Sequence, residues 1–506
     1  MKIVIVGGGT AAWIAASFLL KDRNPLIQLA VIESPNIPII GAGEGATGLF
    51  SGFILNDLKG LGSNVYDFVN DTESTFKFGI RFKNWKGDGS EYFHPIHKSI
   101  TEGVIGDTNF LFNLKKGTPH LTSFGGHVLQ NGSSPYLRFE NKLIPFQSDK
   151  AYTFNFDGIK VGQYLKKLCN NLYKHYSGNV VDITTNPTGY ITSLKMDNGV
   201  VVEGDLFLDC TGFERVLSKK MNNKWIDYSN ELPLNSTILY QRPHNDETIL
   251  PETLAMAHPN GWMFQVPTQT RFGTGYVYCD DFINDTDALA EHIRVVGRDV
   301  IPAKQIKFKT GKLDKVWDKN VLSIGLSASF LEPLQATSIH TTLVQLNTFY
   351  YMFMRNTIEE TISNFNISTY NRRIDSLLDG FKSLAQIHYI SGRDDTPFWR
   401  AMQNEIKITD FNKNILDVCK YRIPAPTEFG FDMGGAGWAV WCWTLAGNGI
   451  ITKEQAINEM KRMNILNQEN RYMNEEKEMR LYTLKLMPND YFVKNILKTG
   501  KFIENN

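Results

Sequence analysis

The chain opens with short apolar runs separated by a glycine-rich turn. Residues 2–6 (KIVIV) form a β-branched run that is typical of a buried parallel strand, and three glycines follow it. Residues 10–20 then have the pattern of an apolar helix, and residues 28–32 (QLAVI) that of a second buried strand, which ends at Glu33. This order predicts a strand–helix–strand unit at the start of an α/β fold.

The rest of the chain mixes strands and helices before it becomes mainly helical. The pattern predicts an amphipathic helix at 157–176, strands at 179–183, 190–195, 204–213 and 321–325, antiparallel strands at 262–278, and helices from about 336, including a charged one near 469–485. Because no linker or low-complexity segment interrupts this series, we expect one compact unit. Its parts are an α/β module with inserted β segments over residues 1–340 and a mainly helical lobe packed on it over 341–506.

Charge and cysteine content exclude several classes of partner. Lys plus Arg equals Asp plus Glu, 53 each, so no overall field attracts nucleic acid or an anionic membrane, and we predict neither as a partner. The five cysteines include no Cys-x-x-Cys pair, which argues against a disulfide framework or a zinc site, and we predict no metal. The start lacks a signal-peptide pattern and no run of about 18 apolar residues occurs, so we expect a cytoplasmic protein.

The glycine turn has the spacing of a dinucleotide-binding motif. Residues 7–12 (GGGTAA) match G-x-G-x-x-G/A, in which the first glycine permits a tight turn, the next lets the backbone approach a pyrophosphate and the alanine allows close helix packing. The helix N-terminus adds unpaired N–H groups, and the acid that ends the second strand can bind a ribose hydroxyl. The residues predicted to bind the dinucleotide are Gly7, Gly9, Thr10, Ala11, Ala12 and Glu33. The alternative is a glycine turn that binds no nucleotide.

A second stretch favours FAD over NAD. Residues 204–213 (GDLFLDCTGF) place Asp209 and Gly212 in a late buried strand and the turn after it. This pattern is common in FAD monooxygenase-like proteins, which contact the flavin a second time. Its other interpretation is a buried strand that ends at a turn.

Four further stretches resemble the tryptophan-halogenase branch of the flavin-dependent halogenases. They are IIGAGEGAT at 39–47, STFKFGIRF at 74–82, GWMFQVPTQTRFGTGYVY at 261–278 and IGLSASFLEPLQATSIH at 324–340. The T-F-K motif and the F-L-E-P-L loop are the most specific of these, and residues 393–402 (RDDTPFWRAM) also resemble a family segment. The resemblance spans the chain from residue 3 to about 450. It implies an FAD-binding Rossmann-like module of the monooxygenase type, interleaved with an antiparallel sheet and followed by a mainly helical C-terminal lobe.

The resemblance also implies a reaction. Reduced FAD, oxygen and a halide yield hypohalous acid, which crosses a tunnel to Lys77. This lysine either hydrogen-bonds the acid or becomes a haloamine, and an electron-rich aromatic small molecule of the indole or phenol type is halogenated. Burial suits this role of Lys77, because desolvation lowers the pKa of an amine. A separate NAD(P)H-dependent flavin reductase is the implied source of reduced FAD, and the choice among chloride, bromide and iodide stays open.

The resemblance assigns further site residues. Flavin contacts are expected at Gly43, Glu44, Asp209, Gly325 and Leu326, and halide contacts at the backbone N–H groups of Thr337 and Ser338. The residues expected in the substrate pocket or tunnel are His94, Ile96, Trp262, Phe264, Pro267, Glu332, Pro333, Gln335, Trp438 and Trp441. The aromatic residues at 262 and 264 are expected to form walls, and their other interpretation is ordinary core packing.

Two departures from the family pattern concern the substrate. Gln335 stands where tryptophan-specific members have a glutamate, and an amide can neither take up a proton nor supply negative charge. We therefore expect phenols or other activated arenes rather than efficient turnover of free tryptophan, and Glu332, the family's other glutamate, is not expected to substitute. Gly434 and Gly435 fall near the usual aromatic clamp and predict a more open pocket.

Two alternatives remain open. A single-component FAD hydroxylase or epoxidase would share the fold and the early motifs, but such enzymes carry Gly-Asp where this chain has Gly325-Leu326. A flavin-binding protein without catalytic activity is the other alternative. The sequence leaves the oligomeric state open, a homo-oligomer included.

Overall fold

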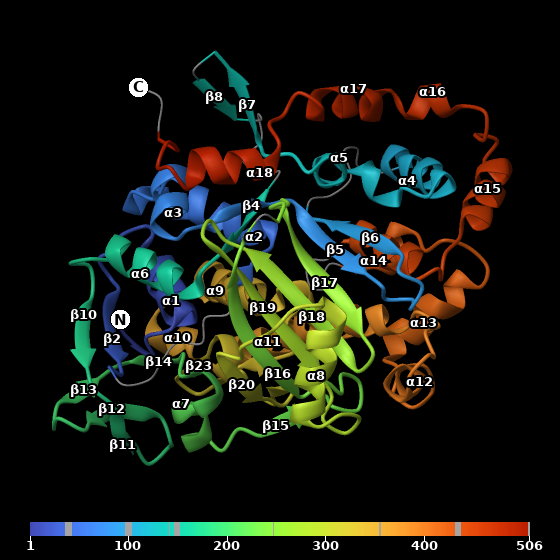
Figure 1. Ribbon diagram of the computed structural model, residues 1–506. Coiled ribbons are helices and arrows are strands. Elements are labelled where there is room, and N and C mark those ends of the chain that lie inside the picture. The colour runs from blue at the N-terminus through green and yellow to red at the C-terminus, as the bar shows by residue number, and fades with distance from the viewer. Residues whose placement is uncertain are drawn as a thin grey trace.

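The computed structural model describes residues 1–35, 43–96, 104–140, 142–145, 152–245, 247–353, 356–430 and 437–503. Two large sheets organise these residues, as Figure 1 shows: one at the N-terminal side and one at the centre, with the helices of the C-terminal half behind and beside them. Within this part of the chain, no helix has the length and apolar character needed to cross a membrane.

The N-terminal sheet has six strands in the order β10-β2-β1-β14-β23-β22. Its strands are β1 (Lys2–Val6), β2 (Gln28–Glu33), β10 (Lys174–Ser177), β14 (Leu206–Asp209), β22 (Trp317–Asp318) and β23 (Val321–Ser323). All neighbours pair in parallel except β22 and β23. Val6 is in register with both Ile32 and Asp209, so the carboxyl ends of three strands meet at one edge, where ligands of such sheets bind.

Helices cover this sheet as the sequence predicts, with one correction. Helix α1 (Thr10–Leu20) follows β1 and packs beside α6 (Gly158–Leu168) and α9 (Thr337–Phe353). The predicted helix at 157–176 was too long, because the chain leaves α6 at Leu168 and residues 174–177 form β10. Parallel pairing of β10 with β2 decides this segment, because hydrogen bonding at the open sheet edge outweighs its amphipathic period.

The central sheet has seven strands in the order β20-β16-β19-β18-β17-β5-β6. They are β5 (Gly79–Lys83), β6 (Glu91–Pro95), β16 (Ser236–Pro243), β17 (Glu252–His258), β18 (Gly261–Pro267), β19 (Arg271–Tyr278) and β20 (Lys304–Lys307). Only β5 and β17 pair in parallel, so the antiparallel strands predicted at 262–278 are confirmed.

The remaining strands form smaller sheets. The sheet β3-β9-β4 contains β3 (Glu44–Gly45), β4 (Thr75–Lys77) and β9 (Thr153–Phe156). The others contain β7 (Tyr136–Phe139) and β8 (Lys142–Pro145); β11 (Val180–Thr185), β12 (Ile191–Met196) and β13 (Val201–Glu203); and β15 (Trp225–Asp227), β21 (Gly311–Leu313) and β24 (Ser329–Phe330).

The remaining helices are mostly C-terminal. They are α2 (Gly48–Gly52), α3 (Val65–Asp71), α4 (Val104–Lys116), α5 (Phe124–Asn131), α7 (Val216–Lys220), α8 (Asp285–Val296), α10 (Ile358–Thr361), α11 (Asn364–Tyr389), α12 (Pro397–Asn404), α13 (Asp410–Cys419), α14 (Trp438–Gly447), α15 (Lys453–Arg462), α16 (Glu469–Tyr472), α17 (Asn474–Thr483) and α18 (Asn489–Phe492). The predicted charged helix near 469–485 is thus two helices.

The C-terminal segment packs back onto the N-terminal half. Helices α15 to α17 follow the outer edge of the molecule (Figure 1), and the segment after α18 reaches α3, where the ring of Phe502 lies 4.8 Å from that of Tyr66. The ring of Phe492 stacks on Tyr136 at 5.2 Å between centroids and lies 5.9 Å from Phe76 of β4, while Phe502 lies 6.0 Å from Phe76. One hydrophobic cluster accordingly runs from Ile3 to Phe502. The segment after residue 450, in which the sequence showed no motif, supports the strand that carries Lys77.

Candidate active site

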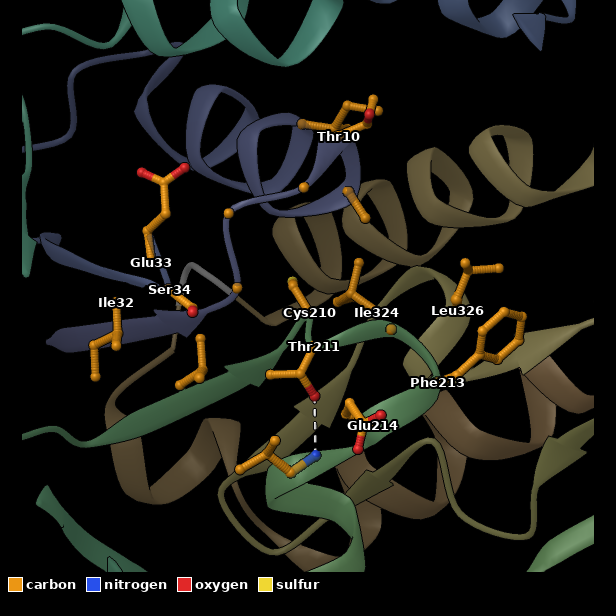
Figure 2. Close-up of a pocket in the computed structure, with 18 of the residues that line it drawn as sticks. Thr10, Ile32, Glu33, Ser34, Cys210, Thr211, Phe213, Glu214, Ile324 and Leu326 are labelled. Carbon is orange, nitrogen blue, oxygen red and sulfur yellow. Dashed lines mark hydrogen bonds between the residues drawn. The ribbon is translucent and has the colours of Figure 1, made fainter. Parts of the chain in front are cut away.

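A cavity of about 780 Å³ opens at the carboxyl edge of the N-terminal sheet. Its lining combines the glycine turn at 7–11, Glu33 at the end of β2 and residues 210–214 after β14. Figure 2 shows Glu33 at the left of this space, Thr10 above it, and Phe213 and Leu326 at its right. The motif residues that the sequence singled out therefore meet around one space.

The glycine turn fits a dinucleotide phosphate. Gly7 has φ +132°, and a Cβ there would overlap the carbonyl oxygen of Cys210, so β1 and β14 can approach only at a glycine. A Cβ at Gly9 would meet no atom within 4 Å, which leaves open space in front of α1. No side chain caps the first turn of α1, so its N–H groups remain for an anionic ligand.

Glu33 lines the same cavity and is held in place by a lysine and a histidine. Lys166 Nζ lies 2.6 Å from its Oε2, and His175 Nε2 lies 3.0 Å from the same oxygen. Both contacts use Oε2, so Oε1 is left to accept a ribose hydroxyl. The lysine comes from α6 and the histidine from β10, which explains why the strand at 174–177 matters for this site.

Three predicted cofactor residues shape the cavity without lining it. The Asp209 carboxylate accepts hydrogen bonds from the N–H groups of Leu217 and Ser218, both at 2.9 Å, and from the Thr211 hydroxyl at 2.6 Å. Its capacity is used by the protein's own donors, so Asp209 holds the turn and is not available for the contact with the flavin that the sequence suggested. Ala12 is buried in the packing of α1. Gly325 has φ +67°, and a Cβ there would lie 2.9 Å from the Cβ of Ala11.

A second cavity of about 260 Å³ adjoins the first. The two share the lining residues Glu44, Phe213, Leu326, Ser338 and Ile339. Apolar side chains form most of the wall of the smaller cavity, including Ile80, Leu239, Phe264, Val266, Phe308, Phe330 and Leu331. The sequence expected walls at positions 262 to 267, and Phe264 does line this cavity, together with Gly43.

Lys77 reaches the smaller cavity from the last position of β4. Strand β4 pairs with β9, with Phe76 opposite Phe154 and Lys77 opposite Thr153. This pairing fixes the direction of the Lys77 side chain, which lines the smaller cavity. Lys77 is 1% exposed, and among the described residues no carboxylate lies within ion-pair distance of it. Burial without a counter-charge lowers the pKa of Lys77 to about 7. Near neutral pH a large fraction of this lysine is therefore a neutral, nucleophilic amine.

Two carboxyl groups line the smaller cavity with Lys77. Burial, and secondarily the charge of Asp157, raises the pKa of Glu44 to about 7. Burial raises the pKa of Glu332 to about 8, against the opposing effect of a 2.8 Å hydrogen bond from the Tyr389 hydroxyl to Oε2. The cavity thus contains an amine and two carboxyl groups, all of which exchange protons near neutral pH.

The predicted halide residues begin helix α9. Thr337 lines the smaller cavity, and Ser338 lines both cavities. The preceding Ala336 has φ +52° and turns the chain from the helical turn Pro333–Gln335 into the 17-residue α9. Because a helix N-terminus carries partial positive charge, an anion is favoured at this junction.

Gln335 belongs to a buried hydrogen-bonded network instead of a cavity wall. Its Nε2 lies 3.3 Å from His94 Nδ1 and 2.5 Å from His388 Nε2. His94 Nε2 contacts the Val440 carbonyl oxygen at 2.6 Å, and the Tyr92 hydroxyl lies 2.8 Å from His388 Nδ1. His388 was missed in the sequence, because it stands alone in α11 with no motif around it.

Other expected pocket residues line neither of these two cavities. Trp262 packs 6.2 Å from Trp85, and the Pro267 carbonyl accepts a 2.6 Å hydrogen bond from Thr75. Trp438 donates to the Pro424 carbonyl at 2.6 Å and Trp441 packs 5.1 Å from Phe411, so both tryptophans anchor α14. Ile96 follows β6, where its N–H donates to Phe78 O at 2.9 Å, while Pro333 lines the smaller cavity as expected. Gly434 and Gly435 lie outside the described residues.

Comparison with known proteins decides the family. A family model described as tryptophan halogenase matches residues 2–463. This chain belongs to the tryptophan halogenase family. Tryptophan 6-halogenase ThaL of Streptomyces albogriseolus is 27% identical over 448 residues, 83% of this chain and 82% of the relative. Tryptophan 7-halogenase RebH of Lentzea aerocolonigenes is 28% identical over 449 residues, 82% and 81% of the two chains.

Solved structures agree with this halogenase over almost its whole length. A tryptophan halogenase from Shewanella frigidimarina NCIMB 400 has a TM-score of 0.87 at 23% identity, covering 99% of this chain and 98% of that one. Tar14, a tryptophan C-6 flavin-dependent halogenase (chlorinase) from taromycin biosynthesis, has a TM-score of 0.86 at 25% identity, covering 97% and 99%. The predicted family, the FAD-binding Rossmann-like fold and flavin-dependent halogenase activity with FAD and a halide are confirmed, and the monooxygenase alternative is not favoured.

Proposed function

We propose that this halogenase acts on an electron-rich aromatic small molecule of the indole or phenol type, with Lys77 as the catalytic residue that receives the oxidised halogen. The observation that carries the proposal is the position of Lys77. It is a buried lysine with a lowered pKa in a cavity that adjoins the dinucleotide cavity at Leu326 and Ser338. A neutral amine there can attack a halogen, and an ammonium can donate hydrogen bonds to it.

The residues of the larger cavity fit FAD. The open backbone at Gly9 and the uncapped N-terminus of α1 suit the pyrophosphate, and Glu33 suits the ribose of the adenosine half. Leu326 and Phe213 line both this cavity and the smaller one. When bound in reduced form, FAD supplies the electrons with which oxygen oxidises the halide.

The chain's own residues would keep the oxidant and deliver it. Thr337 and Ser338 offer the N-terminus of α9 to the halide where the cavities meet. The apolar walls around Phe264, Val266 and Leu331 exclude water, so hypohalous acid formed there is retained until it meets Lys77.

The substrate class rests on position 335. ThaL and RebH are named as tryptophan halogenases, and at 27% and 28% identity they support an aromatic substrate. Position 335 supplies no carboxylate to the cavity, because Gln335 is uncharged and bonded to His94 and His388, so the proposal favours rings that stabilise positive charge through their own oxygen or nitrogen, as phenols and indoles do. A separate NAD(P)H-dependent reductase is proposed as the source of reduced FAD. The five cysteines are buried thiols, which suits a reducing compartment such as the cytoplasm.

The test is a reconstituted reaction with a substrate panel. The protein is incubated with FAD, an unrelated flavin reductase, NADH, chloride or bromide, and a set of indoles and phenols, and products are identified by mass spectrometry. We expect Lys77→Met to lower halogenated product by at least about 10²-fold, with reoxidation of reduced flavin unchanged. Lys86→Met, which removes a partly exposed lysine paired with Asp88, is the matched control. Product formation by Lys77→Met at the parent rate would contradict the role of Lys77.

A further inference from the structure

The turn at 332–335 presents two different faces. Glu332, Pro333 and Leu334 line the cavity that contains Lys77, whereas Gln335 does not. The side chain of Gln335 is directed instead to the imidazoles of His94 and His388. The carboxyl group that this turn offers to the Lys77 cavity is therefore at 332, and position 335 belongs to a separate network.

The hydrogen bonds of this network fix the orientation of the Gln335 amide. A carbonyl oxygen only accepts, so the 2.6 Å contact with Val440 O requires the hydrogen of His94 on Nε2. Burial lowers the pKa of His94 to about 4, so the ring is neutral and its Nδ1 is an acceptor. Gln335 then donates one N–H to His94 and the other to His388, and His388 donates from Nδ1 to the Tyr92 hydroxyl. Both amide hydrogens are used, which locks Gln335 in this position.

Glu332, in contrast, has an unused oxygen. It is 3% exposed, and Tyr389 of α11 donates to its Oε2 at 2.8 Å. Its Oε1 is buried and has no hydrogen-bond partner among the described residues. An unpaired buried carboxyl oxygen is costly, so such an atom in a cavity wall is a candidate for a mobile polar ligand. The titratable groups around this cavity are Tyr389 from α11, Lys77 from β4 and Glu44 from β3.

We propose that Glu332 is a further catalytic residue whose carboxyl group moves the protons that accompany transfer of the halogen from hypohalous acid to the Lys77 amine. This inference rests on the proposed function. The Lys77 nitrogen forms a bond to the halogen while the halogen–oxygen bond breaks, and Glu332 donates its proton to the departing oxygen, which leaves as water. The carboxylate then takes one proton from the Lys77 nitrogen. The balance is amine plus hypohalous acid to haloamine plus water, and Glu332 is regenerated.

The role proposed for Glu332 differs from that of the glutamate that follows E-P-L in tryptophan-specific members. The sequence analysis does not expect Glu332 to replace that glutamate. Here Glu332 acts on Lys77 and the oxidant, and no contact with the substrate ring is needed. Glu44 is the other carboxyl of the cavity, but its Oε1 lies against Gly158 at the start of α6, beside Asp157. That places Glu44 toward the dinucleotide side and makes its variant a useful comparison.

The first test measures three quantities in one reconstituted reaction: flavin reoxidation, halogenated arene, and hypohalous acid released to a β-diketone scavenger. For Glu332→Gln we expect unchanged reoxidation, about 10²-fold less halogenated arene and a matching rise in scavenged oxidant. Glu476→Gln exchanges another buried carboxyl, bonded to Asn113 and outside both cavities, and is expected to match the parent. The proposal would be overturned if Glu332→Gln gave the same amounts of halogenated arene and scavenged oxidant as the parent. It would also be overturned if Glu44→Gln released oxidant and Glu332→Gln did not.

The second test is the pH profile of halogen transfer. The neutral amine of Lys77 requires a pH above about 7, and the protonated carboxyl of Glu332 requires a pH below about 8, so a bell-shaped profile is expected. Glu332→Gln should lose the alkaline limb. Tyr389→Phe removes a hydrogen bond that lowers the pKa of Glu332, so its alkaline limb should move to higher pH. An alkaline limb at the same pH in the parent, Glu332→Gln and Tyr389→Phe would contradict the assignment of that limb to Glu332.

A measurement without turnover keeps the proposal testable if Glu332→Gln folds poorly. The measurement is the infrared C=O band of a protonated carboxylic acid, recorded across pH for the parent and for Tyr389→Phe. In the variant this band should shift in position and titrate at higher pH. Absence of such a band at pH 7 would overturn the proposal. If the parent protein yields neither halogenated arene nor scavenged oxidant, the proposed function fails; if it yields both and Glu332→Gln equals it, only the role of Glu332 fails.

Discussion

At the scale of single residues, position 335 shows how one amide sets the protonation of its neighbours. Because His94 Nδ1 and His388 Nε2 both accept, the residue between them has to offer two donors. A carboxylate offers none. His388 could contact it by a change of tautomer, with the Tyr92 hydroxyl then donating to Nδ1, but His94 donates from Nε2 to the Val440 carbonyl and would have to bind a second proton. The amide at 335 and the two histidines therefore form one unit, which a glutamate cannot enter without a change of charge.

We predict that Gln335→Glu destabilises the folded protein by about 2–3 kcal/mol at pH 8, because acceptors then face acceptors in a buried site. The cost should shrink as the pH falls toward 6, since the new carboxylate raises the pKa of the imidazoles. Urea denaturation at pH 6 and pH 8 measures the first effect, and NMR titration of ¹³C-labelled histidine measures the second. Equal stability at both pH values, with unchanged histidine signals, would show that the donor assignment is wrong.

The sequence could predict residues inside continuous motifs but not their partners. Lys77 was found because it lies within a short continuous stretch that resembles a family motif, whereas Tyr389 and His388 stand on one long helix without any such context. Their roles depend on how α11 packs against β5, β6 and the turn at 333–335. Trp438 and Trp441 illustrate the converse, since aromatic residues near a clamp segment can equally well anchor a helix.

At the scale of elements, the turn between β1 and α1 contains two glycines that are needed for different reasons. Gly7 has a positive φ and touches the Cys210 backbone, so it is required for folding. Gly9 has φ −80°, which any residue tolerates, and faces open space in the cavity. One glycine therefore serves the protein itself and the other leaves room for the cofactor.

We expect Gly7→Ala to lower the free energy of unfolding by roughly 3 kcal/mol, from backbone strain and overlap with Cys210. Gly9→Ala should leave the stability of the FAD-free protein within about 0.5 kcal/mol and weaken FAD binding by 10-fold or more, because its methyl group occupies the space left for the pyrophosphate. Thermal unfolding of FAD-free protein and fluorescence titration with FAD separate the two effects. A Gly9→Ala variant that binds FAD normally would contradict this placement of the phosphates.

Elements with a strong local signal were predictable, and those decided by distant pairing were not. The β1–α1–β2 unit was found within a residue at each boundary, because the β-branched runs and the glycines act locally. Strand β10 was taken for helix, because only its pairing with β2 makes it a strand. The aromatic contacts of Phe492 and Phe502 with Phe76 span more than 400 residues and leave no pattern in the sequence.

At the scale of the whole molecule, burial affects the titration of most histidines. Eight of the ten histidines have a pKa lowered by desolvation: His94, His120, His127, His244, His258, His292, His340 and His388. For all of these except His388, burial brings the pKa to about 3 to 4, against 6.5 for the free side chain. Burial likewise raises the pKa of five carboxyl groups: Glu44, Asp57, Glu252, Glu332 and Glu476.

These two sets act in opposite directions as the pH falls. Between pH 6.5 and about 4.5 the unfolded chain binds more protons at the eight histidines, so acidification favours unfolding. In the same interval the folded protein binds more protons at the five carboxyl groups, which favours folding. Each histidine with a pKa near 4 contributes on the order of 1–2 kcal/mol of destabilisation at pH 5. Since the histidines outnumber the carboxyl groups, the net effect is loss of stability.

We therefore predict that the urea midpoint of the FAD-free protein falls steadily from pH 7 to pH 5. The side chains of His258 and His292 lie 3.0 Å apart between Nε2 and Nδ1, and both rings pack against Tyr276. They cannot both take up protons without like-charge repulsion in a buried site. His258→Asn should accordingly flatten the pH dependence, because one buried titrating group is removed. His175→Asn, which changes an exposed histidine, is the control and should keep the parent slope. A midpoint that stays constant down to pH 5 would mean that the carboxyl groups fully offset the histidines, and that the apparent excess of buried imidazoles has no effect on folding.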